Sequence, residues 1–371
     1  MRFIHMADIH FDSPFRTLTD KRDFGTQRRL EQREAFKKAI EYISKEKIPY
    51  LFIAGDLYDQ DYIRESTIEF INNLFKIIPN TKIFISPGNH DPYLKNSFYN
   101  TFKWNDNVTI FDAEIERIEL EDFDIYGYGF NDFYCSNSEV EKIEIKNKEK
   151  INILLVHGAL DSSKVIDTQY NPITTNKLKE IGFDYIALGH VHKKTDENKY
   201  NFIYPGSMIS FGFDELGEHG MLDIEIEKNK INNSENNYLN NKNKTKINFI
   251  KLDNRIFEEK NIDISEINSS EELIEKIDSI ELNQDKFYKI ILIGTKNTEI
   301  NTNEICKLIN RKDIILKVKD NSEAQHDFDK LSEQNNLKGI FVKKMLARLN
   351  DKNENLNEIK KAIEIGLKSF E

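Results

Sequence analysis

The chain has 371 residues, of which 39% are hydrophobic and 32% are charged, and its net charge is −11. This composition is typical of globular proteins, and the length exceeds that of most single compact domains. No apolar run reaches the roughly 18 residues of a membrane span, and the N-terminus lacks the basic and apolar regions of a signal peptide. We therefore expect a cytoplasmic protein with a main domain and a smaller one, and no contact with a membrane.

Strands and helices alternate in the first half of the chain, which indicates an α/β domain. Strands are predicted over residues 2–7, 50–54, 82–86, 123–128, 151–156, 185–188 and 202–204. Helices are predicted over residues 27–48, 65–78 and 175–182, where apolar residues recur at helical spacing or a glycine ends the pattern. An Asn-rich stretch over 228–246 is interpreted as a solvated hairpin loop, and a strand over 247–252 completes this domain.

The second half of the sequence is predicted to form two smaller structural parts. Ser269 and Glu272 form a capping box that opens a helix reaching residue 280, and strands are predicted over 287–293 and 314–319. Beyond about residue 331 only helical patterns remain, with two apolar stripes separated by the polar segment 350–355. We therefore expect a main domain over 1–253, an α+β cap over 254–330 and a C-terminal helical hairpin over 331–371.

Five short polar clusters each follow a predicted strand directly. They are Asp8-Ile9-His10, Gly55-Asp56-Leu57-Tyr58-Asp59, Gly88-Asn89-His90-Asp91, His157-Gly158 and Gly189-His190-Val191-His192. Groups just past the carboxyl ends of parallel strands in an open sheet converge in one crevice, so we expect the five clusters to meet at one site. Each cluster alone is weak evidence, and His5, His219 and His326, which lack this context, are interpreted as structural or exposed.

The residue types in these clusters indicate a metal centre. Aspartate, histidine and asparagine form a mixed oxygen and nitrogen set that suits Mn²⁺, Fe²⁺ or Zn²⁺, while the two cysteines, Cys135 and Cys306, are too far apart for a zinc knuckle. Two ions roughly 3.5–4 Å apart and bridged by Asp56 would use all the candidate ligands. Such a pair clamps both reacting oxygens of a phosphate ester and lowers the pKa of a bridging water, which predicts phosphoester hydrolysis. The candidate ligands are Asp8, His10, Asp56, Asn89, His157, His190 and His192.

In these motifs, about the first 250 residues resemble the calcineurin-like metallophosphoesterase superfamily. The resemblance implies an α/β fold in which a two-sheet sandwich is flanked by helices. It implies one metal held by Asp8, His10, Asp56 and His192, and a second held by Asp56, Asn89, His157 and His190. It also implies that His90 is the catalytic histidine, which stabilises or protonates the leaving oxygen, and that Asp59 orients His90.

Further detail resembles one group within that superfamily. The motifs GDLYD, PGNHDP and GHVH, the YPGS at 204–207 and the opening segment 2–15 are similar to the SbcD/YhaO group of DNA repair exonucleases. These are bacterial relatives of the nuclease subunit of the double-strand-break repair complex. The resemblance implies a Mn²⁺-dependent 3′-to-5′ exonuclease with endonuclease activity on DNA, an SMC-like ATPase partner and a homodimer.

Two alternatives to a DNA nuclease remain open. A metallophosphatase or phosphodiesterase acting on a small-molecule phosphate ester or a phosphoprotein would use the same metals. The net charge of −11 slightly favours this reading, because DNA-binding proteins usually have a basic surface, although bound metals would add positive charge at the site. A non-catalytic scaffold for an ATPase complex is the other alternative, but every expected ligand is present.

Two groups of basic and aromatic residues are candidate nucleic-acid contacts. One follows the first cluster and consists of Arg16, Arg22, Arg28, Arg29 and Arg33. The other follows the third cluster and consists of Tyr93, Lys95, Phe98, Tyr99, Lys103 and Trp104. The competing interpretation of both is a solvated helix face or an aromatic core.

Overall fold

The computed structural model describes residues 1–15, 22–161, 168–195, 201–228, 244–296, 300–324, 328–349 and 356–370. It forms two compact units, Met1–Phe257 and Glu258–Glu371. We describe each unit by itself.

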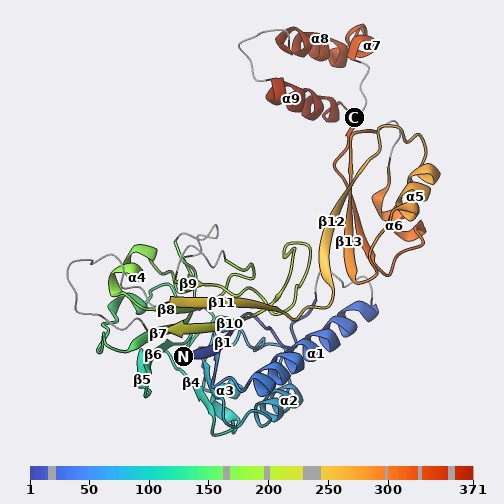
Figure 1. The fold of residues 1–371 in the computed structure, drawn as a ribbon. Coiled ribbons are helices and arrows are strands. Elements are labelled where there is room, and N and C mark those ends of the chain that lie inside the picture. Colours follow the sequence, from blue (N-terminus) through green and yellow to red (C-terminus); the bar gives the residue numbers. More distant parts are fainter. Residues whose placement is uncertain are drawn as a thin grey trace. The chain divides into compact units, whose positions relative to one another are not determined.

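The first unit contains a six-stranded sheet in the order β11-β10-β1-β2-β3-β4 (Figure 1). Strands β1 to β4 are parallel, while β10 pairs antiparallel with β1 and β11 pairs antiparallel with β10. Their bounds are Arg2–Met6 for β1, Tyr50–Ile53 for β2, Lys82–Ile85 for β3, Val108–Ile110 for β4, Gly220–Glu227 for β10 and Lys244–Lys251 for β11.

A second sheet of five strands has the order β5-β6-β7-β8-β9. Strands β6 to β9 are parallel, and β5 is antiparallel to β6. Their bounds are Glu116–Glu119 for β5, Phe123–Tyr128 for β6, Ile151–His157 for β7, Tyr185–Gly189 for β8 and Phe202–Ile203 for β9. One hydrophobic cluster joins alternate residues of both sheets, among them Phe3 and Phe52 from one and Ile153 and Ala187 from the other. The two sheets therefore form a sandwich, as predicted.

Helices cover the outer faces of this sandwich. Helices α1 (Arg22–Glu46) and α2 (Glu65–Phe75) pack beside the six-stranded sheet, and the apolar stripe of α1 from Ala35 to Ile43 is buried there. The short helix α3 (Phe98–Thr101) follows β3. Helix α4 (Thr175–Ile181) packs on the other sheet through Leu178, and it ends at Gly182, which adopts a left-handed φ of 85°. The predicted fold class is confirmed.

The second unit contains a three-stranded sheet, β12-β13-β15, with α5 and α6 on the same face (Figure 1). These elements are β12 (Ile256–Asp263), α5 (Ser270–Ser279), β13 (Lys286–Ile293), α6 (Thr302–Leu308) and β15 (Ile315–Asp320), with a short pair formed by β14 (Thr295–Lys296) and β16 (Glu323–Ala324). The Ser269 side chain accepts a hydrogen bond from the Glu272 amide, as expected for a helix cap. The Glu272 carboxylate accepts from the Asn268 amide rather than from that of Ser269.

The C-terminal residues form α7 (Phe328–Ser332), α8 (Leu337–Leu349) and α9 (Leu356–Lys368). The two predicted apolar stripes pack on each other, with Val342 and Met345 from α8 against Ile359, Ile363 and Leu367 from α9. This cluster is separate from the cluster that fills the α+β part. The division of the second unit near residue 331 remains a prediction.

Several elements were not predicted from the sequence, most importantly the strands β10 and β12 and the helix α6. Strand β10 begins at a glycine and carries the buried Asp223, whose carboxylate binds Arg2 of the neighbouring strand β1. The predicted Asn-rich hairpin loop connects β10 to its antiparallel neighbour β11, but residues 229–243 of it lie outside the described residues. Among the described helices, none is long and apolar enough to cross a membrane.

Candidate metal centre

The five polar clusters lie together, although their strands belong to two sheets. Asp8 follows β1, Asp56 follows β2 and Asn89 follows β3 in the six-stranded sheet, whereas His157 ends β7 and His190 follows β8 in the five-stranded sheet. The prediction that the clusters converge at the edge of a single open sheet was therefore wrong. The site forms where the carboxyl ends of strands from both halves of the sandwich face each other.

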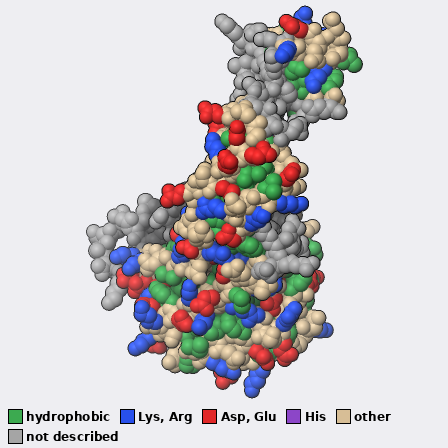
Figure 2. All heavy atoms as spheres, turned by 90° about the vertical axis from the view of Figure 1, so that its right-hand side faces the viewer, with side chains coloured by type: hydrophobic (Ala, Val, Ile, Leu, Met, Phe, Trp, Pro, Cys, Tyr) green, Lys and Arg blue, Asp and Glu red, His purple; other side chains and the backbone are tan. Residues whose placement is uncertain are grey.

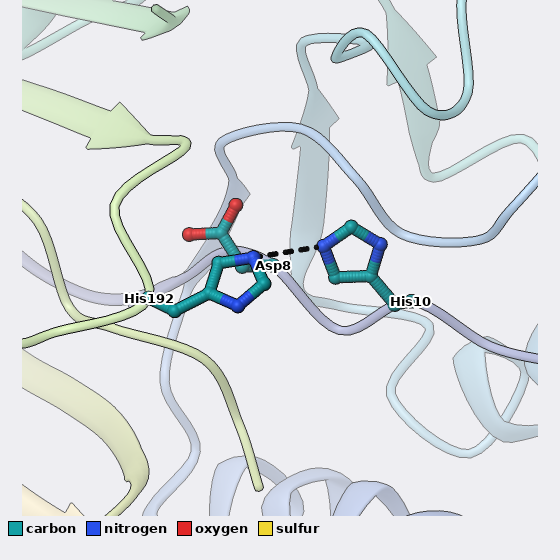
Figure 3. Close-up of side chains that lie close together, drawn as sticks. All are labelled: Asp8, His10 and His192. Atoms are coloured by element: carbon teal, nitrogen blue, oxygen red, sulfur yellow. Dashed lines mark hydrogen bonds between the residues drawn. The ribbon is translucent and has the colours of Figure 1, made fainter. Parts of the chain in front are cut away.

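One group of candidate ligands consists of Asp8, His10 and His192, whose ligand atoms lie within 4.8 Å of one another (Figure 3). His10 Nδ1 is 3.2 Å from the Asp59 carboxylate and His192 Nδ1 is 2.6 Å from the Glu215 carboxylate, so in each ring Nδ1 donates a proton. The two Nε2 atoms then face each other across 3.1 Å. Two imidazole lone pairs at that distance repel each other unless a proton or a metal ion lies between them.

A second group surrounds Asp56. His157 Nδ1 donates to the Ala54 carbonyl at 3.0 Å, so its Nε2 is an acceptor. That Nε2 lies 3.3 Å from Asp56 Oδ2 and 3.0 Å from Asn89 Oδ1. Asp56 Oδ2 is also 3.6 Å from His10 Nε2, which places this carboxylate between the two groups. Three acceptor atoms without a donor among them have the chemistry of a cation site.

His190 borders these groups without joining them through its side chain. Its ring centroid is 5.3 Å from that of His157, and its backbone amide donates to Asp8 Oδ1 at 2.9 Å. Burial and the neighbouring His157 lower the pKa of His190 to about 4, so its imidazole is neutral at physiological pH. A neutral imidazole is the form that ligates a metal.

His90 is the most exposed histidine of the site, with 51% of its side chain accessible. Its Nδ1 lies 2.7 Å from Asp59 Oδ1, the same oxygen that faces His10. Although burial lowers it, the hydrogen bond that His90 donates to Asp59 and the nearby Asp56 carboxylate together raise the pKa of His90 to about 9. The imidazolium is therefore stable there and can donate a proton toward solvent.

The buried carboxylates and histidines of the site shift one another's pKa values. Burial raises the pKa of Asp8 to about 6, whereas for Asp56 the effect of burial is outweighed by His157, His10 and His90, and its pKa falls to about 2. For His192, the Glu215 carboxylate outweighs burial and raises the pKa to about 9. A metal that binds His192 must therefore displace its proton.

Several candidate metal ligands have an unusual backbone conformation with a positive φ. Asp8 and His10 have φ values of 52°, Asp56 of 52° and His190 of 112°, all in the region that non-glycine residues rarely occupy. Close packing also demands a glycine at position 88, because a Cβ there would overlap the Asp56 carboxylate. Local strain of this kind aims side chains from several strand ends at one point.

Two residues that hold the ligands in place were not predicted from the sequence. Glu215 accepts from His192, from the Ser207 hydroxyl at 3.0 Å and from the Phe211 amide at 3.0 Å. Asp91 accepts from the amides of Asp56 and Gly88 and so supports the loop after β2. No local motif marks Glu215, whereas Asp91 stands in the third cluster without an assigned role.

A cavity of about 450 Å³ opens beside the site. His10, Asn89, His90 and His192 line its inner end, and the walls are aromatic. Tyr134 and Tyr170 stack with centroids 5.9 Å apart, as do Phe15 and Phe211 at 5.1 Å. Among the described residues that line it, none is a lysine or an arginine. The cavity is large enough for one nucleotide-sized group.

The two predicted groups of nucleic-acid contacts are only partly suited to that role. Tyr99 is buried and its hydroxyl donates to Asp91, so its ring belongs to the core. Trp104 is half-buried, and its indole N–H donates to the Phe98 carbonyl. Arg28 is fully buried in an ion pair with Asp253 and cannot reach a phosphate. Arg16 and the Arg22 side chain lie outside what the structure describes. Of the three histidines interpreted as structural or exposed, His5 and His219 are buried, and His326 lies outside the described residues.

A family model described as calcineurin-like phosphoesterase matches residues 1–194, more than half of the chain. The chain is also 26% identical over 243 residues to the "Uncharacterized metallophosphoesterase YhaO" of Bacillus subtilis, a match that covers 62% of this chain and 59% of that protein.

Two further relatives are named as a subunit of the nuclease SbcCD. The one from Staphylococcus epidermidis is 26% identical over 271 residues, covering 63% of this chain and 68% of that protein. The one from Staphylococcus saprophyticus is 24% identical over 262 residues, covering 62% and 67%. The chain thus spans less than two thirds of the YhaO protein and about two thirds of the two nuclease subunits.

Proposed function

Because this chain belongs to the calcineurin-like phosphoesterases, we propose that it is a cytoplasmic two-metal phosphodiesterase that hydrolyses DNA in repair, with Mn²⁺ as its preferred metal. One observation supports this most: acceptor atoms suited to bind metal ions and the exposed His90, whose ring is held by Asp59, line the same cavity. We propose a 3′-to-5′ exonuclease with endonuclease activity.

In this proposal, Asp8, His10, Asp56 and His192 hold one ion, and Asp56, Asn89, His157 and His190 hold the other. The ions would supply Lewis-acid activation of the phosphate ester and neutralise its negative charge. The protein groups fit this role because Asp59 and Glu215 each accept a hydrogen bond from the Nδ1–H of a ligand histidine, which directs its Nε2 toward the metal position. The carboxylate of Asp56 lies between the two ligand groups, as a shared ligand requires.

His90 acts in the proposal as the proton donor to the leaving oxygen. Asp59 keeps its Nδ1 proton in place and stabilises the imidazolium, so that Nε2 carries a proton into the cavity. When the ester bond breaks, this proton passes to the departing oxygen and leaves His90 neutral. Asp59 therefore orients two histidines, one for the metal and one for the leaving group.

The choice of DNA rests on the resemblance to the SbcD/YhaO group and on two relatives named as nuclease subunits. Because those relatives are named as subunits, we also propose a partner, an SMC-like ATPase, and a homodimer. The helical hairpin is the part we assign to docking, since Leu337 and Ile365 stay 75% and 63% exposed on it.

A nuclease assay on end-labelled single- and double-stranded DNA tests the proposal, with Mn²⁺ and Mg²⁺ compared. We expect Mn²⁺-dependent shortening of the labelled strand by the wild type and none by Asp56→Ala or His90→Ala. Intact DNA after incubation with metal-loaded wild type would exclude the nuclease.

A phosphatase or phosphodiesterase for a small phosphate ester is the second candidate. It is favoured by one observation: no lysine or arginine is among the described residues that line the cavity. Turnover of a mononucleotide or of bis(p-nitrophenyl) phosphate together with intact DNA would select it.

A further inference from the structure

A second cavity, of about 460 Å³, lies next to the first and has the opposite character. Its walls include Arg29 and Arg33 of α1 and Arg64, the residue that precedes α2. Hydroxyl groups from Thr26, Ser66 and Thr67 line it as well. We call it the arginine groove.

The arginine groove adjoins the cavity at the metal centre. Pro14 and Tyr62 line both of them, and Tyr62 is 47% exposed at this shared rim. Both cavities also border the loop after β1, whose residues Asp8 and His10 belong to the candidate metal centre and whose Asp12 lines the groove. A chain-like ligand that crosses the rim at Pro14 and Tyr62 would occupy both cavities.

Part of the groove is held rigidly. The Asp12 carboxylate accepts from the Arg64 amide at 3.2 Å and the Thr67 hydroxyl at 2.6 Å, and it lies 3.5 Å from the Arg33 guanidinium. Arg33 also donates to Thr67 Oγ1 at 2.7 Å and lies over the Phe70 ring. Arg33 is thereby partly neutralised and fixed in position.

The other two arginines are available to a ligand. Within the described part of the chain, neither Arg29 nor Arg64 makes an ion pair with a carboxylate, and Arg29 contacts only the Thr26 hydroxyl at 3.2 Å. On the face in Figure 2, acidic and basic side chains are interspersed and form no large patch of one sign. The described lining of the groove, by contrast, has three arginines and one carboxylate, that of Asp12. Positive charge is thus in local excess there, in a chain whose net charge is −11.

We infer that the arginine groove binds the phosphodiester backbone of a polynucleotide strand whose scissile phosphate lies at the metal centre. Arginine guanidinium and hydroxyl groups are the usual protein contacts to phosphate oxygens. A small phosphate ester needs no more than the first cavity, whereas a polynucleotide also needs a charge-matched path for the phosphates on either side of the bond that is cleaved. The inference rests on the proposed function and names its substrate as a polymer.

The test measures binding apart from cleavage. Fluorescence anisotropy of a labelled single-stranded DNA oligonucleotide is recorded with Ca²⁺ in place of Mn²⁺, over a series of salt concentrations. The test variant is Arg29→Gln/Arg64→Gln, and the matched control is Lys45→Gln/Lys76→Gln, which removes the same charge from exposed positions on the same two helical segments. Thermal melting checks that both variants are folded.

We expect the test variant to bind about tenfold or more weakly, and the slope of log affinity against log salt to become shallower by about 1.4, from about 0.7 for each lost phosphate contact. The control should bind within about twofold of the wild type. Equal affinities for the two variants, or no salt-dependent binding by the wild type, would overturn the inference. Failure of the proposed nuclease has a different signature, since DNA would then be bound through the groove but remain uncut in Mn²⁺.

Discussion

Glu215 holds His192 through a contact of 2.6 Å between its Oε1 and the histidine Nδ1. The two residues lie on either side of β9 in the chain, and Glu215 is itself fixed by the Ser207 hydroxyl and the Phe211 amide. The carboxylate thus determines which nitrogen of His192 faces His10. Glu215 is a positioning residue for the metal centre, since it reaches the metal only through His192.

Glu215→Gln should weaken metal binding by about 10- to 100-fold, because the amide cannot stabilise the Nδ1 proton as a carboxylate does. Calorimetric titration with Mn²⁺ measures this. Activity should return at saturating Mn²⁺, which separates a loss of metal from a loss of chemistry. Glu218→Gln is the matched control, because Glu218 is 58% exposed and pairs with Lys251. Unchanged metal affinity in Glu215→Gln would refute the positioning role.

His90→Asn should lower kcat by about 100- to 10,000-fold, the usual contribution of a proton donor, while metal content stays at the wild-type level. Single-turnover cleavage of an end-labelled oligonucleotide, whose leaving sugar oxygen needs a proton, together with metal analysis of the purified protein, gives both values. Asp59→Asn should lower both kcat and metal affinity, because Asp59 contacts His10 at 3.2 Å as well as His90 at 2.7 Å. A His90→Asn protein that keeps full kcat would exclude His90 as the proton donor.

Arg28→Met should lower the free energy of unfolding by about 3–5 kcal/mol, because it leaves the buried Asp253 carboxylate without its cation. Both side chains of this pair are 0% exposed, and the pair ties α1 to the segment after β11. Urea unfolding is the measurement. The control Lys37→Met breaks an ion pair of 3.9 Å whose side chains are 51% and 59% exposed, and it should cost less than about 1 kcal/mol. A similar loss of unfolding free energy in the two variants would contradict the prediction that the buried pair matters more than the exposed one.

His5 should make the protein less stable in mild acid. Burial in β1 lowers the pKa of His5 to about 3, whereas in the unfolded chain the pKa is about 6.5. Below pH 6.5 the unfolded state takes up a proton that the folded state does not, so the free energy of unfolding falls by about 1.4 kcal/mol per pH unit down to about pH 3.

His5→Phe removes this proton uptake. Between pH 7 and pH 5, its stability relative to the wild type should rise by about 2 kcal/mol, as measured by urea unfolding of the metal-free proteins. The other histidines contribute equally to both proteins and cancel in the difference. The lost hydrogen bond to the Tyr185 hydroxyl lowers stability by the same amount at each pH. A difference that does not change with pH would show that His5 titrates normally.

Local sequence was enough to predict most of the fold that positions the site. Buried parallel strands such as β2 and β7 are short apolar runs, and each ends in a polar cluster whose residue types indicate a metal. The prediction was wrong where the local signal was weak or mixed. Strand β10 was missed because it begins at Gly220 and contains the buried, charged Asp223, whose partner Arg2 is 221 residues away.

The sequence by itself determined which side chains stand at strand ends, because periodicity and residue type act within a few neighbours along the chain. Only the tertiary structure decided which distant groups meet. It placed the strand ends on two sheets, paired Glu215 with His192, buried Arg28 against Asp253, and set Arg64 beside Arg29 in a groove that no motif marks. These contacts depend on packing between segments far apart in the chain, where local propensity has no influence.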